Sequence, residues 1–446
     1  MKTAPLLAPL PLLAWALLLP GLPTAQQGQP HRAGAFDVLH YAARVEPDIA
    51  SGSLAGTVVV TLEIMTDDLE AIELNRGDLT VDSVSEEGKP MPFEEVDRHL
   101  RVRLSRPARA GDRHEIEIDY HGTPRYGLEF FPEQSQVYTI FSTSQWLVCV
   151  DAPADRATLE LSVVLPERLR SVANGRFLGS RSLQDGRVLH EWHQNRPVPT
   201  YVFGFAAGRF TEVVERRGDV SLRHLGDGFS EAELGRVFAD TAEMLAFFED
   251  RSGVPYDDPA YTQALVAETI GQEMATFTLM SEDYGRRMLD DPASSSLAAH
   301  ELAHQWWGNM VTCRDWRHFW LNEGFGTFMA AAWMEHRFGR EAYLREIQSS
   351  RDRFEKVRDA GGDRSLVFPD WDRPTSADRT LVYHKGAYVL HLLREEMGEE
   401  AFWDGVRHYT QMYFGDSVTT PDFQETMEQS SGTDLSEFFD EWVYLR

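Results

Sequence analysis

The stretch HELAHQWWGN at residues 300–309 constrains the fold of this chain more than any other feature. Its two histidines, His300 and His304, are four positions apart, so on a helix they lie one turn apart on the same face. That spacing allows both imidazoles to bind a single zinc ion. Glu301 then points to a neighbouring position, where it can hold a water molecule without binding the metal. We therefore expect a helix over SSLAAHELAHQWW that carries part of a zinc site.

A catalytic zinc site normally has three protein ligands and one open position. The stretch WLNEGFGTFMAAAW begins a second apolar helix, and its Glu323 follows His304 by 19 positions. If this helix packs on the first, its carboxylate completes a site for one Zn²⁺ ion made of His300, His304 and Glu323. The four aromatic residues around the motif are expected to pack in the core rather than contact a substrate: Trp306, Trp307, Trp316 and Trp320.

Such a site predicts hydrolysis of an amide bond. Zinc brings the pKa of a bound water to about 7, and Glu301 is placed to take the proton. Glu301 would then pass this proton to the leaving amine. Besides the zinc ion, a second donor is needed for the oxyanion that forms on the carbonyl oxygen. The alternative for the motif is a helix with two packed core histidines and an exposed Glu323.

The first half of the chain carries strand patterns. Three runs are rich in β-branched residues with apolar and polar positions alternating: GTVVVTLEI (56–64), RHEIEIDY (113–120) and ATLELSVVLP (157–166). Turn-forming stretches separate them. We predict an all-β, sandwich-like N-terminal domain over residues 37–211.

Helical periodicity takes over near residue 212. It is clearest in four segments: 230–253, 326–339, 386–398 and 435–445. A small sheet is expected near YTQALVAE (261–268). The sequence therefore predicts an α+β multidomain protein, with a mainly helical catalytic domain over residues 212–446.

Residues 1–25 have the layout of a secretory signal peptide. Lys2 precedes a leucine-rich run, and the small residue Ala25 precedes a polar segment. Prolines interrupt the run, which argues against a stable membrane helix. We expect a secreted or periplasmic protein without stable membrane insertion after signal cleavage; a retained N-terminal anchor is the alternative.

The net charge argues against two classes of partner, and the two cysteines raise the question of a disulfide. A formal net charge of −28 disfavours nucleic acid and anionic lipid as partners and mildly favours cationic ligands, including free amines. Cys149 and Cys313 could form one disulfide, but two buried thiols are the expected state.

The zinc segment is similar to that of the aminopeptidase N family, the gluzincin aminopeptidases that include leukotriene hydrolase. The similar stretches are HELAHQWWGNMVT (300–312) and WLNEGF (320–325), and the β half contributes LVCVDAPADRATLELSVVLP (147–166). The resemblance runs through most of the chain. It implies a thermolysin-like catalytic domain and a zinc aminopeptidase that acts on peptides with a free N-terminus.

The resemblance also assigns roles to residues outside the zinc helix. VYHKGAYVLHLL (382–393) resembles the segment with the family's catalytic tyrosine, which implies that the hydroxyl of Tyr383 stabilises the tetrahedral intermediate. Without the resemblance, Tyr383 would be interpreted as a packed tyrosine. The family's Gly-x-Met-Glu-Asn motif, whose glutamate binds the substrate α-amine, corresponds here to IGQEMATFT (270–278). Glu273 matches its glutamate, and Gly271 is taken as its glycine, although it lies two positions before the glutamate instead of three; Gln272 replaces the methionine and Met274 the asparagine.

The chain departs from the family in two further respects. Ile140 stands about where the family's β domain offers a glutamine to the substrate N-terminus. The sequence ends at FFDEWVYLR, so we expect a short form without the family's C-terminal helical domain, with a more open active site or one closed by a second subunit.

Other functions remain open at this stage. The same zinc chemistry would serve an open-cleft, thermolysin-like endopeptidase or an epoxide hydrolase. Glu273 argues against the endopeptidase, unless it is a plain surface glutamate in a loop. A non-catalytic binding module of the same fold is the third alternative, although such a protein would be expected to have lost ligands or the base.

Overall fold

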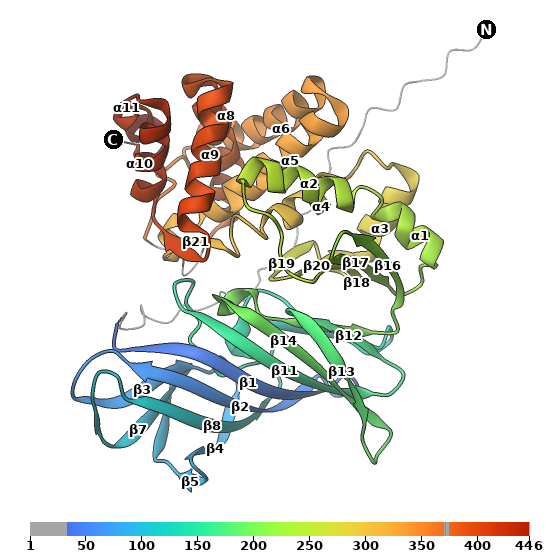
Figure 1. Cartoon of the computed structure of the whole chain (residues 1–446), viewed down its shortest axis with the longest axis vertical. Coiled ribbons are helices and arrows are strands. Elements are labelled where there is room, and N and C mark those ends of the chain that lie inside the picture. Colours follow the sequence, from blue (N-terminus) through green and yellow to red (C-terminus); the bar gives the residue numbers. More distant parts are fainter. Residues whose placement is uncertain (1–33, 370, 372–373, 446) are drawn as a thin grey trace.

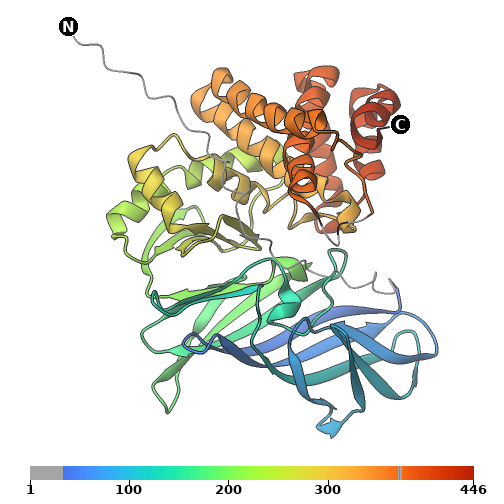
Figure 2. The same ribbon diagram turned by 180° about the vertical axis from the view of Figure 1, so that it is seen from behind.

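The computed structural model describes residues 34–369, 371 and 374–445, so the predicted signal peptide lies outside the described residues. Strands form the lower part of the molecule and helices the upper part, in both views (Figures 1 and 2). The chain passes from one part to the other between β15 (Phe205–Gly208) and β16 (Thr211–Arg217). The predicted order of a β-rich domain followed by a helical domain is confirmed.

The β domain is built from three sheets. In the eight-stranded sheet, of order β13-β14-β11-β1-β2-β8-β4-β5, only β1 and β11 are parallel neighbours. Its alternation is clear in β2, where Val58, Val60 and Leu62 are fully buried. The strands of this sheet are β1 (Phe36–Asp48), β2 (Ser53–Ile64), β4 (Thr80–Glu86), β5 (Lys89–Pro90), β8 (Arg113–Gly122), β11 (Arg156–Pro166), β13 (Arg176–Ser182) and β14 (Arg187–Pro199).

Two smaller sheets complete the β domain. The three-stranded sheet has the order β3-β7-β6 and the four-stranded sheet has the order β12-β15-β10-β9. The remaining elements are β3 (Leu69–Asn75), β6 (Phe93–Val96), β7 (His99–Ala108), β9 (Leu128–Phe131), β10 (Gln136–Thr139), β12 (Arg170–Ala173) and the 3₁₀ turns η1 (Thr143–Gln145) and η2 (Thr200–Val202).

A five-stranded sheet connects the two parts of the molecule. Its order is β16-β17-β18-β20-β19, and β19 is an edge strand antiparallel to β20. Along β18, Leu265 joins the core under the helices, while Ala264 and Val266 join the core of the β domain. Both faces of the sheet are therefore buried. The strands that follow β16 are β17 (Val220–Gly226), β18 (Ala260–Val266), β19 (Gly271–Met274) and β20 (Phe277–Ser281).

Helices cover the far face of this sheet. The helical pattern at 230–253 is divided into two helices, because the chain leaves helical geometry at Phe238, whose ring stacks on buried His224 at 4.8 Å. Trp306, Trp307 and Trp320 are buried in the core, as expected, whereas Trp316 is only partly buried and packs against it. The first helices are α1 (Glu231–Val237), α2 (Thr241–Ser252), α3 (Glu282–Asp290), α4 (Ser296–Ala303), α5 (Trp320–Phe338) and α6 (Arg340–Asp359).

The last part of the chain packs on α5. A two-stranded parallel sheet joins this last part to the segment that follows α4: β22 (Asp416–Val418) pairs with β21 (Val311–Cys313). The elements are η3 (Trp316–His318), α7 (Ser376–Thr380), the π-helical turn η4 (Leu381–Lys385), α8 (Gly386–Met397), α9 (Glu399–Tyr413), α10 (Thr420–Ser431), α11 (Ser436–Phe439) and η5 (Asp440–Tyr444).

Cys149 and Cys313 are both buried free thiols, as predicted. Among the helices of the described residues, none is both long and apolar enough to cross a bilayer.

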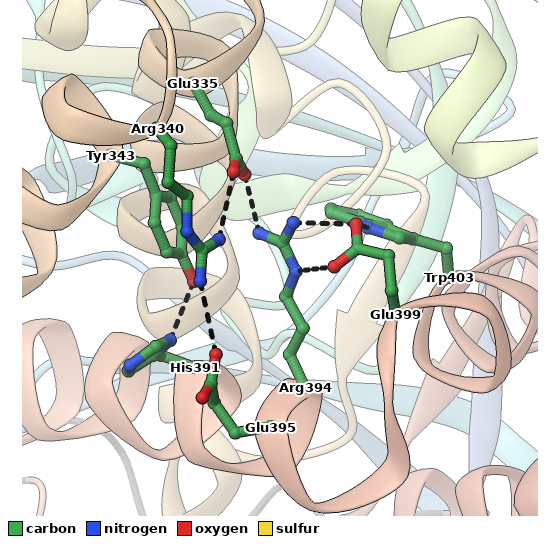
Figure 3. Close-up of polar contacts among 8 residues, drawn as sticks. All are labelled: Glu335, Arg340, Tyr343, His391, Arg394, Glu395, Glu399 and Trp403. Atoms are coloured by element: carbon green, nitrogen blue, oxygen red, sulfur yellow. Dashed lines mark hydrogen bonds and ion pairs between the residues drawn. The ribbon is translucent and has the colours of Figure 1, made fainter.

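A polar cluster joins the ends of four helices (Figure 3). The Arg394 side chain, only 6% exposed, donates from Nη1 to Glu335 on α5 at 2.7 Å. Its Nε and Nη2 donate to the two carboxylate oxygens of Glu399 on α9, both at 2.7 Å. Arg340, at the start of α6, donates to Glu335 at 2.9 Å and to Glu395 on α8 at 3.2 Å. The cluster therefore fixes the far ends of α5 and α8 relative to one another.

Replacing Arg394 with methionine should lower the free energy of unfolding by roughly 2–4 kcal/mol, because it removes three charge-assisted hydrogen bonds made by a guanidinium that is only 6% exposed. Chemical denaturation would measure this. Arg351→Met is the matched control: the Arg351–Glu355 pair is exposed, so its loss should cost less than about 1 kcal/mol. Equal losses in the two variants would show that the cluster does not stabilise the helix ends.

Asp155 is a buried carboxyl in the β domain. Burial raises its pKa to about 8, and the charge of Asp37 adds to the rise. Its Oδ2 has no hydrogen-bond partner within the described part of the chain. Because the folded pKa lies above the ordinary value of 3.8, the folded state holds the proton that the unfolded state loses. The contribution of Asp155 to stability is therefore complete only below about pH 3.8, and it is lost progressively as the pH rises from there through about 8.

Asp155→Asn removes this dependence because asparagine does not titrate. The free energy of unfolding of the variant minus that of the parent chain should rise by roughly 1–3 kcal/mol from pH 5 to pH 8.5. A tenfold change in a proton-binding constant corresponds to about 1.4 kcal/mol. Denaturation curves at the two pH values test this. A stability difference that does not change with pH would contradict the assignment.

Candidate metal centre

Three side chains from two packed helices converge on one point. The Nε2 atoms of His300 and His304 on and just after α4 lie 3.0 Å apart. Oε2 of Glu323, in the first turn of α5, lies 3.4 Å from His300 Nε2 and 3.6 Å from His304 Nε2. All three ligand atoms fall within 4.8 Å of one another, the arrangement expected around a single ion. The predicted set His300, His304 and Glu323 is thus brought together.

The donor set fits zinc. His304 donates through Nδ1 to the carbonyl of Trp307 at 2.8 Å, which leaves a lone pair on Nε2 facing the other ligands. Oε2 of Glu323 is buried and has no hydrogen-bond partner within the described residues. The two imidazoles and the carboxylate thus direct free lone pairs at one point. This set matches the ligands of a catalytic zinc ion.

Glycines make room for this arrangement. A Cβ on Gly326 would lie 2.8 Å from His304 Nε2 and 2.9 Å from His300 Cε1. A Cβ on Gly386 of α8 would lie 3.0 Å from the Cα of Gly324 of α5. These two helices therefore cross at backbone contact, which places Glu323 close to the segment that precedes α8.

The β domain supports the ligands from behind. The hydroxyl of Tyr201 donates to the carbonyl of Gly308 at 2.8 Å and accepts from Asn322 Nδ2 at 3.1 Å. Asn322 in turn accepts from the backbone N–H of Cys313 at 3.0 Å. Tyr201 and Asn322 were not predicted from the sequence, because the contact joins positions 121 residues apart.

Glu301 lies on α4 beside the ligands and is only 4% exposed. Burial raises the pKa of Glu301 well above its ordinary value, and the charge of Glu273 adds to the rise. Gly271 on β19 faces it, and any Cβ at that position would overlap Glu301 Oε1. Gly271 is therefore needed where the sheet edge passes the predicted base.

Glu273 lies on the edge strand β19, not on a surface loop, and is 8% exposed. Burial raises its pKa to about 7, with the positive charge of His304 opposing and the negative charge of Glu323 adding to the shift. Glu273 thus presents a largely buried carboxylate beside the ligand cluster.

Tyr383 lies on the π-helical turn η4, a geometry that occurs often at functional sites. Its ring stacks on that of His300 at 5.9 Å between centroids, with 8° between the planes. Buried Lys385 anchors the turn by donating to Asp363 at 2.8 Å and to the carbonyl of Arg364 at 3.0 Å. Burial, with the charges of nearby Glu323 and Glu273, raises the pKa of Tyr383 well above its ordinary value, so its hydroxyl stays protonated and can donate.

All seven residues singled out from the sequence therefore surround one point: His300, Glu301, His304, Glu323, Tyr383, Gly271 and Glu273. The site combines three metal ligands, an extra carboxylate, a protonated phenol and a second carboxylate on a strand edge. Such a set can activate water, donate to an oxyanion and bind a cation.

Comparison with known families agrees with this geometry. Residues 38–202 match the peptidase M1 N-terminal domain, and residues 237–442 match the peptidase family M1 domain. Together the two matches span most of the chain.

Individual relatives are similar over most of the chain. Probable aminopeptidase 2 of Sulfurisphaera tokodaii is 24% identical, over 82% of this chain and 48% of the relative. Leucine aminopeptidase 2 of Aspergillus fumigatus is 26% identical, over 88% and 68%. Leukotriene A-4 hydrolase of Xenopus laevis is 25% identical, over 87% and 68%. The chain thus spans about half to two-thirds of the length of these relatives.

Solved structures are similar to the whole architecture. A mutant M1 zinc metallopeptidase from Deinococcus radiodurans, bound to a Tyr-Ser-Ala substrate, has a TM-score of 0.79 and 25% identity. The match covers 93% of this chain and 95% of that one. A two-domain M1 zinc metallopeptidase bound to L-tryptophan matches with the same TM-score, 0.79.

Proposed function

The chain belongs to peptidase family M1, and on this premise we propose that it is a zinc-dependent aminopeptidase that hydrolyses the first peptide bond of peptides with a free N-terminus. The observation that supports this substrate most directly is the position of Glu273. A largely buried carboxylate beside the three metal ligands can pair with an α-ammonium group, and so fix the scissile bond one residue from the end. The relatives named aminopeptidases support the same function.

The roles follow from the positions of the side chains. His300, His304 and Glu323 would hold the zinc ion, which would supply a Lewis acid that lowers the pKa of water and polarises a carbonyl group. Glu301, raised in pKa and buried beside the ligands, takes the proton of the attacking water. It then gives this proton to the nitrogen of the leaving peptide.

Tyr383 acts on the charge that develops on the carbonyl oxygen. Its hydroxyl remains protonated and lies on a turn that is fixed by Lys385, so it can donate to the oxyanion without rearrangement. Glu273 holds the ammonium group throughout, because none of the bonds that form or break involve it.

A pair of peptides tests the proposal. The purified chain with zinc is given one short peptide with a free N-terminus and the same peptide N-acetylated, and the products are identified by mass spectrometry. Release of single residues from the free form alone would support an aminopeptidase. Internal cleavage of both forms would indicate an endopeptidase, and cleavage of neither would refute peptide hydrolysis.

Replacing Glu273 with alanine should raise KM for free-amine substrates at least about tenfold and reduce kcat less, because the lost interaction is a buried ion pair with the substrate. Steady-state kinetics on an aminoacyl 4-nitroanilide measure this. Glu268→Ala, an exposed glutamate just before β19, is the matched control and should have no effect. An unchanged kcat/KM in Glu273→Ala would refute the role as amine anchor.

We also propose that the protein is exported. The support is the signal-peptide layout of residues 1–25, with Lys2, an apolar run and Ala25. N-terminal sequencing of the chain from an expressing cell tests this: a start near Gln26 in the exported fraction supports cleavage. An intact Met1 in the cytoplasm contradicts export.

A further inference from the structure

Gln272 lies next to the proposed amine anchor but has no part in the mechanism above. It is fully buried on the edge strand β19. Its Nε2 donates to Oε2 of Glu273 at 2.8 Å. Its Oε1 accepts from the backbone N–H of Phe141, in the β domain, at 3.1 Å. One amide group therefore contacts both the carboxylate and the opposite domain.

The partners fix the orientation of this amide. If the group were flipped, its NH₂ would face the N–H of Phe141 and its oxygen would face the carboxylate of Glu273. Both contacts would then be repulsive, donor against donor and acceptor against acceptor. Gln272 is therefore held in one orientation, with a hydrogen of the NH₂ group directed at Glu273.

The turn around Phe141, to which Gln272 is hydrogen-bonded, is itself constrained. Phe141 has a positive φ of 57°, uncommon for a residue with a side chain, and the residue is 47% exposed. Backbone bonds on either side, from Ile140 to Gly127 at 3.0 Å and from Ser142 to Ile140 at 2.8 Å, hold the turn closed. The turn therefore holds the backbone N–H of Phe141 in a fixed position close to the site, where it donates to Gln272.

We propose that Gln272 is a positioning residue for amine recognition. Gln272 holds the Glu273 carboxylate in one rotamer and couples it to the Phe141 turn of the β domain. Because Gln272 bonds to Oε2 of Glu273, Oε1 of Glu273 is the oxygen that faces the ammonium group of a substrate. A free glutamate side chain samples several rotamers, and a hydrogen bond to a charged acceptor selects among them. This inference rests on the proposed function of Glu273 and adds the residue that orients it.

Kinetics of two variants, each made alone and together with Glu273→Ala, test the proposal. Gln272→Met keeps the length of the side chain but neither donates nor accepts an N–H···O bond. Gln272→Glu still accepts from Phe141 but cannot donate to Glu273, and it adds a like charge. On leucine 4-nitroanilide, Gln272→Met should raise KM about tenfold with kcat within about threefold, and Gln272→Glu should raise KM further.

The double variants separate positioning from general structural support. If Gln272 acts through Glu273, adding Gln272→Met to Glu273→Ala should change kcat/KM less than about twofold. The same loss in both backgrounds would overturn the proposal, as would a Gln272→Met variant with unchanged KM. Zinc content and the unfolding midpoint of each variant should match the parent chain.

A binding measurement distinguishes this inference from the proposed function. Calorimetry with leucinol, which has the α-amine and side chain of leucine but no amide bond to cleave, reports amine binding without turnover in the zinc-loaded parent and in Gln272→Met. A Kd about tenfold weaker in the variant supports the positioning role even if the parent chain cleaves no peptide, an outcome that would refute only the aminopeptidase. An equal Kd overturns the positioning role even if the parent is an active aminopeptidase.

Discussion

Glu301→Gln is expected to lower kcat by at least about 10³-fold while leaving zinc content and the fold unchanged. Glutamine has the same shape as glutamate but cannot take a proton from water, and Glu301 serves both as the base and as the acid of the reaction. Glu301 is 4% exposed, and its carboxylate occupies the space that a side chain at Gly271 would fill. Glutamine has the same size and therefore fits there. KM should change little, because the residue does not hold the substrate in the ground state.

The measurement is single-turnover release of an N-terminal residue, with metal analysis on the same sample. Glu268→Gln, the same change at an exposed position, should leave the rate unaltered. A Glu301→Gln variant that kept bound zinc and a kcat within tenfold of the parent would remove Glu301 from the mechanism.

Tyr383→Phe is expected to lower kcat by about 10²–10³-fold, the usual cost of losing one donor to an oxyanion. The phenylalanine ring preserves the stacking on His300, so the zinc ligands should stay in place. Because the hydroxyl is needed only when charge develops on the carbonyl oxygen, kcat and kcat/KM should fall together with little change in KM.

Tyr388→Phe is the matched control. Tyr388 lies on α8, and its ring packs beside those of Phe354 and Trp442, away from the ligand cluster. Loss of its hydroxyl should leave kcat within about twofold. A Tyr383→Phe variant as active as this control would mean that another group stabilises the oxyanion.

Helix periodicity was enough to predict the zinc ligands. The spacing of His300 and His304 specifies a shared helical face, and Glu323 stands in the first turn of the next apolar helix. The packing of α4 on α5 that brings them together could be anticipated, because both helices are apolar and must bury one another. The alternation that predicts strands in the first half, such as that of β2, reflects the same requirement for burial.

Contacts between distant segments could not be predicted in this way. Tyr201, Gln272 and Lys385 act through partners on other elements, and a single sequence contains no signal for such pairs. The π-helical turn around Tyr383 was also missed, since it lies just before the segment 386–398 in which a helix was predicted. Likewise, the break at Phe238, whose ring stacks on that of His224, was not predicted from the sequence.

Assignment of Glu273 depended on the family resemblance rather than on the residues themselves. A lone glutamate in IGQEMATFT carries no pattern that separates a surface loop from a buried strand edge. The structure places it on β19 next to the ligands, where its burial gives it a reason to bind a cation.

The most direct test of a zinc aminopeptidase at this site is a metal titration. The chain is stripped with a chelator, and Zn²⁺ is added back in fractions of the protein concentration while release of the N-terminal residue from an unblocked peptide is followed. The rate should be negligible without zinc, rise in proportion to bound zinc, and level off at one ion per chain; His304→Ala should stay inactive throughout. Full activity in the stripped chain, or none with one zinc bound at His300, His304 and Glu323, would contradict the account.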